Sequence, residues 1–382
     1  MIRAYVGMSG GVDSSVTAAL LVEQGYDVTG VYMKNWSQDL PGMKCPWAED
    51  LADAKRVAVQ LGIDFKVYDF EAEYKHKVVD YMIAEYEAGR TPNPDIMCNQ
   101  EVKFKLFLET ALEDGADMIA TGHYARVEHR FSPTKFSDTA SRPLSLDPPS
   151  GDNGAADASE NLSANARLLQ AVDTNKDQTY FLYRVTADAL EKTLFPLGDY
   201  TKTEVRELAK ARGLWTATKK ESMGVCFVGS VGMREFLSQY VTTRPGDIID
   251  RQNGKLIGRH DGAIFYTLGQ RHGLDVGGGL PYYVVGKDMQ KNEVYVSTNL
   301  NDTEMWRSEV TLRDVHWIGE SLDDGAECQV RLRHRGPLVS AKLGYKETEI
   351  TLTLSEPQRA VTPGQSAVIY RASICCGGGI IV

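Results

Sequence analysis

Short apolar runs alternate with stretches of helical periodicity from the start of the chain to about residue 130. The apolar runs that predict strands lie at 4–6, 26–33, 64–70 and 116–125. The periodic stretches that predict helices lie at 15–24, 48–62, 73–89 and 103–115. Such alternation is typical of a doubly wound α/β fold with a parallel sheet, in which ligands bind beyond the carboxyl ends of the strands.

The pattern changes after this α/β region. Residues 131–166 are rich in Ser, Asp, Pro, Gly and Asn and nearly lack aromatic residues, which predicts a flexible surface insertion without a catalytic role. Helical periodicity returns at 186–193 and 201–212. From about residue 225, alternating strands with turn signals predict two smaller β-rich modules, the last a barrel or sandwich. We expect three domains, at 1–205, 206–285 and 286–382.

Composition narrows the class of protein without identifying it. The chain has 382 residues and a formal net charge of −10, which argues mildly against coating nucleic acid non-specifically but leaves local RNA contacts open. No apolar run approaches the roughly 20 residues that a membrane span needs. The chain enters a strand almost at once, without a signal peptide or presequence pattern. We therefore expect a cytoplasmic protein without a membrane partner, with a mitochondrial one as the alternative.

The cysteines are dispersed rather than arranged in a repeated C-x-x-C pattern. This spacing disfavours a disulfide scaffold and a zinc ribbon, so cysteine chemistry here would involve single residues or a distant pair. The six positions are Cys45, Cys98, Cys226, Cys328, Cys375 and Cys376.

A turn rich in glycine and serine, SGGVDSS at 9–15, separates the first strand from the first helix. It matches neither the Walker loop nor the dinucleotide fingerprint. Glycine amides, serine hydroxyls and a helix N-terminus suit a phosphate group, and Asp13 could hold Mg²⁺. The alternative is an ordinary capped helix start, because Asp and Ser are good N-caps.

This turn resembles the phosphate loop of the ATP pyrophosphatases (the PP-loop), which adenylate a carbonyl oxygen and release pyrophosphate. Longer blocks are similar to the tRNA-specific 2-thiouridylase family. They are GRTPNPDIMCNQEVKF, ATGHYARV, KDQTYFLY, FPLGDYTKTEVRELA and ESMGVCFVG, followed by DGAIFYTLGQRHGL, PYYVVGKD and AVTPGQSAVIY. The resemblance covers nearly the whole chain outside 131–166. It implies a PP-loop ATP pyrophosphatase domain followed by two smaller β-rich modules, the last a β-barrel.

The resemblance implies a tRNA-uridine 2-sulfurtransferase that thiolates the wobble uridine, U34, of the tRNAs for Lys, Glu and Gln. ATP would convert the C2 oxygen into an adenylate, and a cysteine persulfide would deliver the sulfur. In this assignment Cys226 carries the persulfide, Cys98 is the partner cysteine and Asp95 is a general acid/base. Cys98 follows a Pro-Asn-Pro loop and enters a helix N-terminus, which would lower a thiol pKa.

The remaining site residues also follow from the resemblance. The target base would contact Asn93, Pro94 and Asp95, and His123 would touch the uridine or the phosphates. The implied ATP-binding residues are Gly7, Met8, Ser9, Gly10, Gly11, Val12, Asp13, Ser14, Met33 and Gly122. The implied tRNA contacts are Lys176, Asp177, Gln178, Arg331, Leu332 and Gln365.

Several of these residues have a purely structural interpretation as well. His123 fits a satisfied strand-end histidine equally well. Basic residues alternate in RLRHRG, residues 331–336, so one face of a predicted strand would meet phosphate or merely solvent. Leu332 stands where many relatives have an aromatic residue, which weakens base stacking there. Cys45 is ambiguous, and the other three cysteines are expected to be inert.

The expected cofactors are ATP and Mg²⁺, and the expected partners are tRNA and a persulfide-donor protein. An iron–sulfur cluster is not supported by the sequence, and the oligomeric state is open. One rival is a small-molecule ATP pyrophosphatase of the argininosuccinate synthase type, which would need no cysteine pair. A non-catalytic sulfur carrier is a second alternative, which leaves the SGGVDSS turn unexplained. A structural RNA-binding module is a third, which the acidic balance disfavours.

Overall fold

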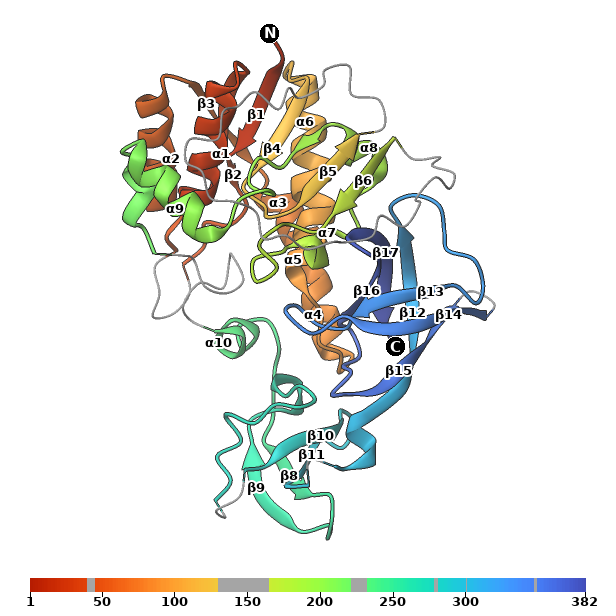
Figure 1. Cartoon of the computed structure of the whole chain (residues 1–382). Helices are drawn as coiled ribbons and strands as arrows, with labels where there is room; N and C mark the ends of the chain where they lie inside the picture. The colour runs from red at the N-terminus through yellow and green to blue at the C-terminus, as the bar shows by residue number, and fades with distance from the viewer. Residues whose placement is uncertain (40–44, 130–164, 221–231, 278–280, 300, 347–348) are drawn as a thin grey trace.

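The computed structural model describes residues 1–39, 45–129, 165–220, 232–277, 281–299, 301–346 and 349–382. Figure 1 shows an α/β region at the N-terminal end, a barrel beside it and a small sheet at the opposite end of the molecule. This arrangement confirms the expected fold class.

The α/β region is built on a parallel sheet with strand order β3-β2-β1-β4-β7. Alternate residues of β1 face opposite sides, as the two-residue period of a strand requires: Val6 packs in one apolar cluster and Tyr5 in another. In chain order the strands are β1 (Arg3–Gly7), β2 (Asp27–Lys34), β3 (Asp64–Asp69), β4 (Met118–Thr121) and β7 (Thr193–Leu194).

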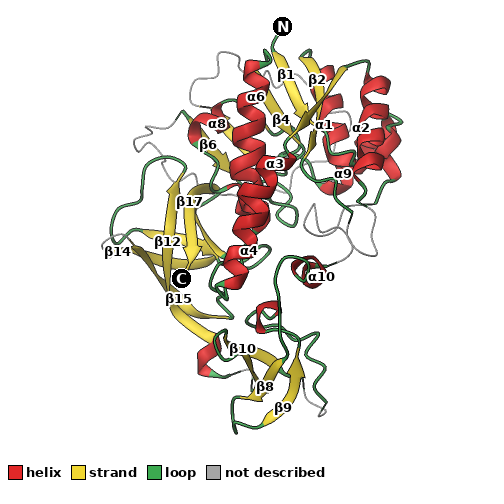
Figure 2. Cartoon of the chain, turned by 180° about the vertical axis from the view of Figure 1, so that it is seen from behind, coloured by secondary structure: helices red, strands yellow, loops and turns green. Residues whose placement is uncertain are grey.

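Helices cover both sides of this sheet (Figures 1 and 2). One group contains α1 (Val12–Glu23), α2 (Trp47–Leu61), α9 (Lys202–Ala211) and η3 (Trp215–Thr218). The other contains α3 (Glu71–Tyr74), η1 (Lys75–Val79), α4 (Asp80–Glu87), α5 (Pro94–Met97), η2 (Cys98–Leu106) and α6 (Phe107–Glu113). Two short helices, α7 (Thr179–Leu182) and α8 (Ala187–Glu191), follow β6.

In the second group of helices, the helix that carries Cys98 begins earlier than the sequence pattern predicted. The helix expected at 103–115 begins at Pro94, because the Asn93 side chain accepts a hydrogen bond from the Asp95 amide and proline occupies the first helical position. The segment η2 has π-helical hydrogen bonds. Cys98 consequently lies one turn inside a helix, which agrees with the expectation that it enters a helix N-terminus after the Pro-Asn-Pro loop.

The middle of the chain forms a four-stranded sheet of order β10-β11-β8-β9. It is preceded by α10 (Met233–Leu237), and η4 (Ala263–Phe265) and η5 (Thr303–Met305) flank its later strands. The strands are β8 (Gly246–Asp250), β9 (Leu256–His260), β10 (Tyr283–Asp288) and β11 (Glu293–Ser297). The sheet thus runs past residue 285, while α9 and η3 pack on α1. The three domain boundaries stay a prediction.

The C-terminal strands close into a six-stranded barrel, because β12 pairs with both β15 and β17. A hairpin of the α/β region, β5 (Arg126–His129) and β6 (Ala166–Leu169), continues this sheet by pairing with β17. The barrel strands are β12 (Trp306–Trp317), β13 (Glu327–Arg331), β14 (Val339–Lys346), β15 (Glu349–Arg359), β16 (Ser366–Arg371) and β17 (Ile374–Ile381).

Two further expectations from the sequence concern the insertion at 131–166 and membrane-spanning helices. The predicted flexible insertion at 131–166 lies outside the described residues up to residue 164. Among the helices that the structure describes, none combines the length and apolar character needed to cross a bilayer.

Candidate active site

The SGGVDSS turn lies at the carboxyl end of β1 and leads directly into α1. Ser14 organises the turn: its Oγ accepts a hydrogen bond from the Ser9 amide at 3.2 Å, lies 3.3 Å from Ser9 Oγ and donates to the Gly11 carbonyl at 3.2 Å. The Ser15 hydroxyl donates to the same carbonyl at 2.7 Å. The serines therefore shape the loop from within, as a preformed anion site requires.

Two glycines let other segments approach this loop closely. Gly10 has φ +73°, and a Cβ there would lie 2.3 Å from the Asp50 carbonyl oxygen of α2. A Cβ at Gly122 would lie 2.8 Å from the Ser14 amide nitrogen. The ATGHY block after β4 thus touches the first turn of α1, which brings two of the implied ATP-binding regions together.

Asp13 is held by a lysine and a tyrosine from two other segments. Lys202 Nζ lies 2.7 and 2.8 Å from the two carboxylate oxygens, and the Tyr124 hydroxyl donates to Oδ1 at 2.9 Å. Gln178 in turn accepts from the Tyr124 amide at 2.9 Å. Gln178, an implied tRNA contact, therefore supports the phosphate loop.

Met33 lies beside the start of the loop. A Cβ at Gly7 would come within 2.9 Å of Met33 Cε. Both residues stand at the carboxyl ends of neighbouring parallel strands, β1 and β2, where the adenine was expected.

Asp95 and Cys98 lie one turn apart on the helix that Asn93 caps. Burial raises the pKa of Asp95 above its ordinary value, and the charge of Lys103 opposes this shift. Cys98 is buried, with 3% of its surface exposed. Cys226, the expected persulfide carrier, lies outside the described residues. The structure therefore describes one cysteine of the expected pair.

His123 links the phosphate loop to the Cys98 helix. It follows Gly122 and packs between Phe104 of η2 and Phe195, at ring-centroid distances of 5.6 and 6.1 Å. Its Nδ1 lies 2.8 Å from Thr121 Oγ1. Burial holds the pKa of His123 well below its ordinary value, and Lys103 acts in the same direction, so the ring is neutral at pH 7.

The implied tRNA contacts mostly lie at the junction of the α/β region and the barrel. Asp177 is buried and forms an ion pair with Arg331 at 2.9 Å. Gln365 Nε2 donates to the Thr91 carbonyl at 2.8 Å. The half-buried Leu332 packs against the barrel core. The Lys176 amide bonds the Asp173 carbonyl at 3.0 Å, within a turn.

The basic strand face expected in RLRHRG is corrected by the structure. Strand β13 ends at Arg331, and residues 332–335 form bends and a turn. Arg335 takes φ +59°, which turns the chain. Arg331 is buried whereas Arg333 and Arg335 are exposed, so these residues do not form one row on a strand.

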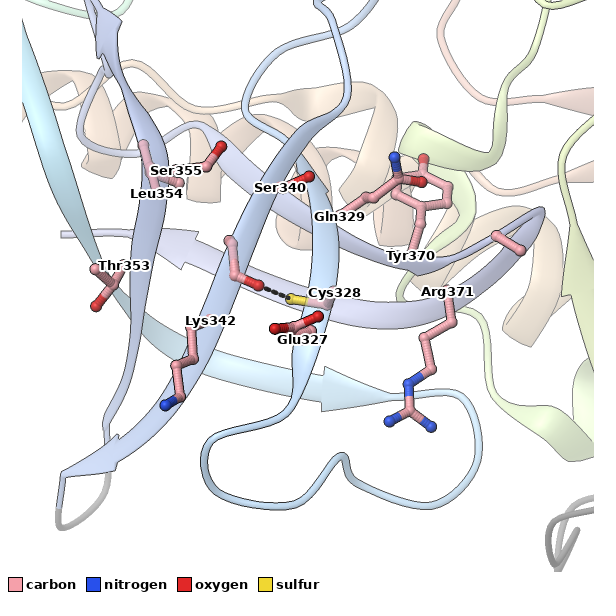
Figure 3. Close-up of a pocket in the computed structure, with 12 residues that line it drawn as sticks. Glu327, Cys328, Gln329, Ser340, Lys342, Thr353, Leu354, Ser355, Tyr370 and Arg371 are labelled. Carbon is pink, nitrogen blue, oxygen red and sulfur yellow. Dashed lines mark hydrogen bonds between the residues drawn. The ribbon is translucent and has the colours of Figure 1, made fainter. Parts of the chain in front are cut away.

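The other described cysteines are not placed for chemistry. Cys45 donates to the Trp36 carbonyl at 3.7 Å, and burial raises its pKa. Cys328 lines a pocket on the barrel, where it donates to the Ala341 carbonyl at 3.6 Å and burial raises its pKa to about 11 (Figure 3). Burial also raises the pKa values of Cys375 and Cys376. Raised thiol pKa values disfavour the reactive thiolate.

The described residues also show whether side chains lie close enough to bind a metal ion together. Among them, no group of three or more His, Cys, Asp or Glu side chains is placed to hold a metal ion. Cys226 lies outside the described residues.

Sequence reasoning missed three polar residues at the site: Lys103, Tyr124 and Lys202. The position of Lys202 could have been predicted from the sequence. Thr201 and Glu204 form a capping box, which places the start of α9 at Lys202. Lys103 and Tyr124 stand inside matched blocks, but their neighbours come from distant segments. Nothing in the local sequence indicates those contacts.

The fold and loop together define a protein class: a HUP-type α/β domain with two appended β domains. Family models match in that order: the tRNA methyl transferase HUP domain over residues 2–230, the tRNA methyl transferase PRC-barrel domain over 234–298 and the aminomethyltransferase beta-barrel domain over 307–381.

Curated relatives refine the class. The tRNA-specific 2-thiouridylase MnmA of Bacillus subtilis is 44% identical over 99% of this chain and 94% of its own length. That of Enterococcus faecalis is 42% identical over 99% and 95%. The chain belongs to the tRNA-specific 2-thiouridylase family. Among solved structures, a predicted tRNA methyltransferase subunit from Methanocaldococcus jannaschii covers 55% of this chain and 76% of its own, at 16% identity and a TM-score of 0.30, too low for an argument.

Proposed function

We propose that the protein is an ATP-dependent sulfurtransferase that thiolates C2 of the wobble uridine in tRNA, with the Lys, Glu and Gln tRNAs as substrates. Family membership over nearly the full length supports the reaction class. The observation that carries the proposal is a continuous line of contacts. It runs from the phosphate loop through Gly122 and His123 to Phe104, on the helix of Cys98.

The phosphate loop serves the activation step. Residues 7–14 would surround the ATP phosphates with amides and hydroxyls, and Met33 would lie against the adenine. Gly10 and Gly122 support this role, because their lack of a side chain lets α2 and the ATGHY block pack directly against the loop. ATP supplies the adenylyl group that turns the C2 oxygen into a leaving group, and pyrophosphate departs. Asp13 would hold Mg²⁺ once its ion pair with Lys202 is broken, and the metal would neutralise charge on the phosphate oxygens.

The cysteine helix serves the sulfur step. The Cys98 thiolate attacks Sγ of the Cys226 persulfide, forms a disulfide with it and frees the terminal sulfur, which attacks C2 as AMP leaves. A thiol reductant then restores both cysteines, and a persulfide-donor protein reloads Cys226. Asp95, whose pKa burial raises, is suited to hold or pass the proton involved. A cytoplasmic setting is part of the same proposal.

The test couples the two steps in one reaction. Unmodified tRNA-Lys transcript is incubated with ATP, Mg²⁺ and a low-molecular-weight persulfide, and AMP and 2-thiouridine are both quantified. We expect equal amounts of the two products from the wild-type protein and no 2-thiouridine from Cys98→Ser or Cys226→Ser. Cys328→Ser, a cysteine of the barrel, is the matched control and should retain both products.

Two results would count against the proposal. If neither product forms with any of the three tRNAs, a small-molecule ATP pyrophosphatase becomes the better account. If AMP forms while the RNA stays unthiolated in the presence of the persulfide, the loop is assigned correctly and the sulfur route is not.

A further inference from the structure

The segment Arg90–Pro94, which leads into the Cys98 helix, is held by the two β domains. The Thr91 amide donates to the Pro363 carbonyl at 2.9 Å. The Gln365 side chain completes the contact, since its Nε2 donates to the Thr91 carbonyl at 2.8 Å and lies 3.4 Å from the Pro92 carbonyl. The barrel loop thus satisfies both backbone polar groups of Thr91.

Neighbouring contacts strengthen this junction. Thr91 Oγ1 lies 3.2 Å from Thr267 Oγ1 of the middle domain. The buried Glu85 carboxylate accepts two hydrogen bonds from Arg90, and Arg313 of β12 binds it at 3.0 Å. A Cβ at Gly364 would lie 2.8 Å from the Thr91 amide nitrogen, so barrel and segment are in direct contact.

The position of this segment sets the position of the reactive helix. Only Pro92 separates Thr91 from Asn93, whose side chain caps the turn that carries Asp95 and Cys98. Proline has a restricted φ, so Pro92 and Pro94 leave little freedom between the anchor and the helix start. A displacement at Thr91 is therefore transmitted to Cys98 rather than absorbed.

We propose that Gln365 is a positioning residue for the sulfur step: it anchors Thr91 and Pro92 to the barrel and thereby holds Cys98 in place. This inference rests on the proposed thiolation. It assigns Gln365 a role within the protein, where resemblance had implied a contact with tRNA.

Two measurements on Gln365→Leu test this role, with Gln358→Leu of the same barrel as the matched control. The first is the alkylation rate of Cys98 in the free protein, read by peptide mass spectrometry. We expect Cys98 to react about fivefold faster, as loss of one net hydrogen bond predicts. Buried Cys375 in the barrel should be unchanged. The second is steady-state thiolation, where we expect a lower kcat at unchanged KM for tRNA.

Other outcomes overturn the inference. A raised KM with unchanged Cys98 alkylation would mean that Gln365 contacts the RNA directly. Equal acceleration at Cys98 and Cys375 would mean that the substitution merely loosens the barrel. If the wild-type protein thiolates no tRNA, the proposed function fails, while the alkylation comparison still decides whether Gln365 positions Cys98.

Discussion

At the scale of single residues, the bond between Lys202 and Asp13 sets the charge at the phosphate loop. A cation 2.7 Å from the loop carboxylate neutralises it before any nucleotide binds. In the proposed reaction the same ammonium would be available to the ATP phosphates once Mg²⁺ binds the carboxylate. We therefore propose that Lys202 is part of the ATP site although it lies far along the chain.

Replacing Lys202 tests whether it is part of the ATP site. We expect Lys202→Met to weaken ATP·Mg²⁺ binding by about tenfold, the factor for losing a charge-assisted contact of about 1.4 kcal/mol, and Lys202→Arg to restore part of it. Equilibrium binding of a non-hydrolysable ATP analogue measures the effect without catalysis. Lys210 on the same helix is exposed and serves as the control. Unchanged affinity in Lys202→Met would remove Lys202 from the site.

A second residue-scale prediction concerns pH. Burial lowers the pKa of Lys287 to about 8 from its ordinary value of 10.5, and its Nζ donates to the Tyr266 carbonyl at 2.8 Å. Because the unfolded chain binds more protons between these two pKa values, the free energy of unfolding rises with pH across that window. The charged Lys287 ammonium therefore lowers the free energy of unfolding by its full amount below pH 8.

We therefore expect Lys287→Met to stabilise the protein at pH 7 by about 2 kcal/mol, after the lost hydrogen bond is deducted. This gain should shrink as the pH approaches 10. Thermal melts at pH 7 and pH 9.5 measure it, with exposed Lys291→Met as the control. A gain that is equal at both pH values would contradict the assigned pKa.

At the scale of elements, the sequence predicts which helices and strands form, but it does not predict which of them pack against each other. The apolar alternation that placed strands at 4–6, 26–33 and 64–70 is local, and the structure confirms those strands. The helix expected at 103–115 begins earlier, at Pro94, because an Asn cap followed by proline is also compatible with a loop. The approach of Gly122 to α1 could not be predicted, because it depends on how β4 and α1 pack.

The close contact between Gly122 and α1 leads to a prediction for Gly122→Ala. The new methyl group would overlap the Ser14 amide, which belongs to the phosphate loop. We expect at least a tenfold loss of nucleotide affinity with an unchanged far-ultraviolet circular dichroism spectrum. Gly25→Ala is a suitable control, because φ is +81° there but a Cβ would meet nothing within 4 Å. It should lower stability by about 1 kcal/mol and leave affinity alone.

At the scale of the whole molecule, the α/β region and the barrel share a sheet and the buried Asp177–Arg331 ion pair. Strand β6 pairs with β17, and the Asp177–Arg331 pair lies between the two regions, with the Asp177 side chain fully buried. The apolar pattern predicted strands in the C-terminal region but not β6, and it carries no information about a partner two hundred residues away. The resemblance implied RNA contacts for Asp177 and Arg331, which stay a prediction, and the structure adds that the two side chains pair with each other.

The buried pair predicts a stability effect. We expect Asp177→Asn to destabilise the protein by about 3 kcal/mol, because the Arg331 charge would stay buried without its partner. The double variant Asp177→Asn/Arg331→Met should recover part of the loss. Chemical denaturation of the single and double variants measures the coupling. Strictly additive losses would mean that the two residues act independently.

The proposed function requires that sulfur reaches C2 of a tRNA uridine. The direct measurement is nucleoside mass spectrometry of tRNA-Lys, with its site of modification mapped, after incubation with the protein, ATP, Mg²⁺ and a persulfide. We expect a uridine at position 34 in which sulfur has replaced the C2 oxygen, and no such product without ATP. A methylated uridine, or an RNA unchanged while ATP is consumed, would contradict it.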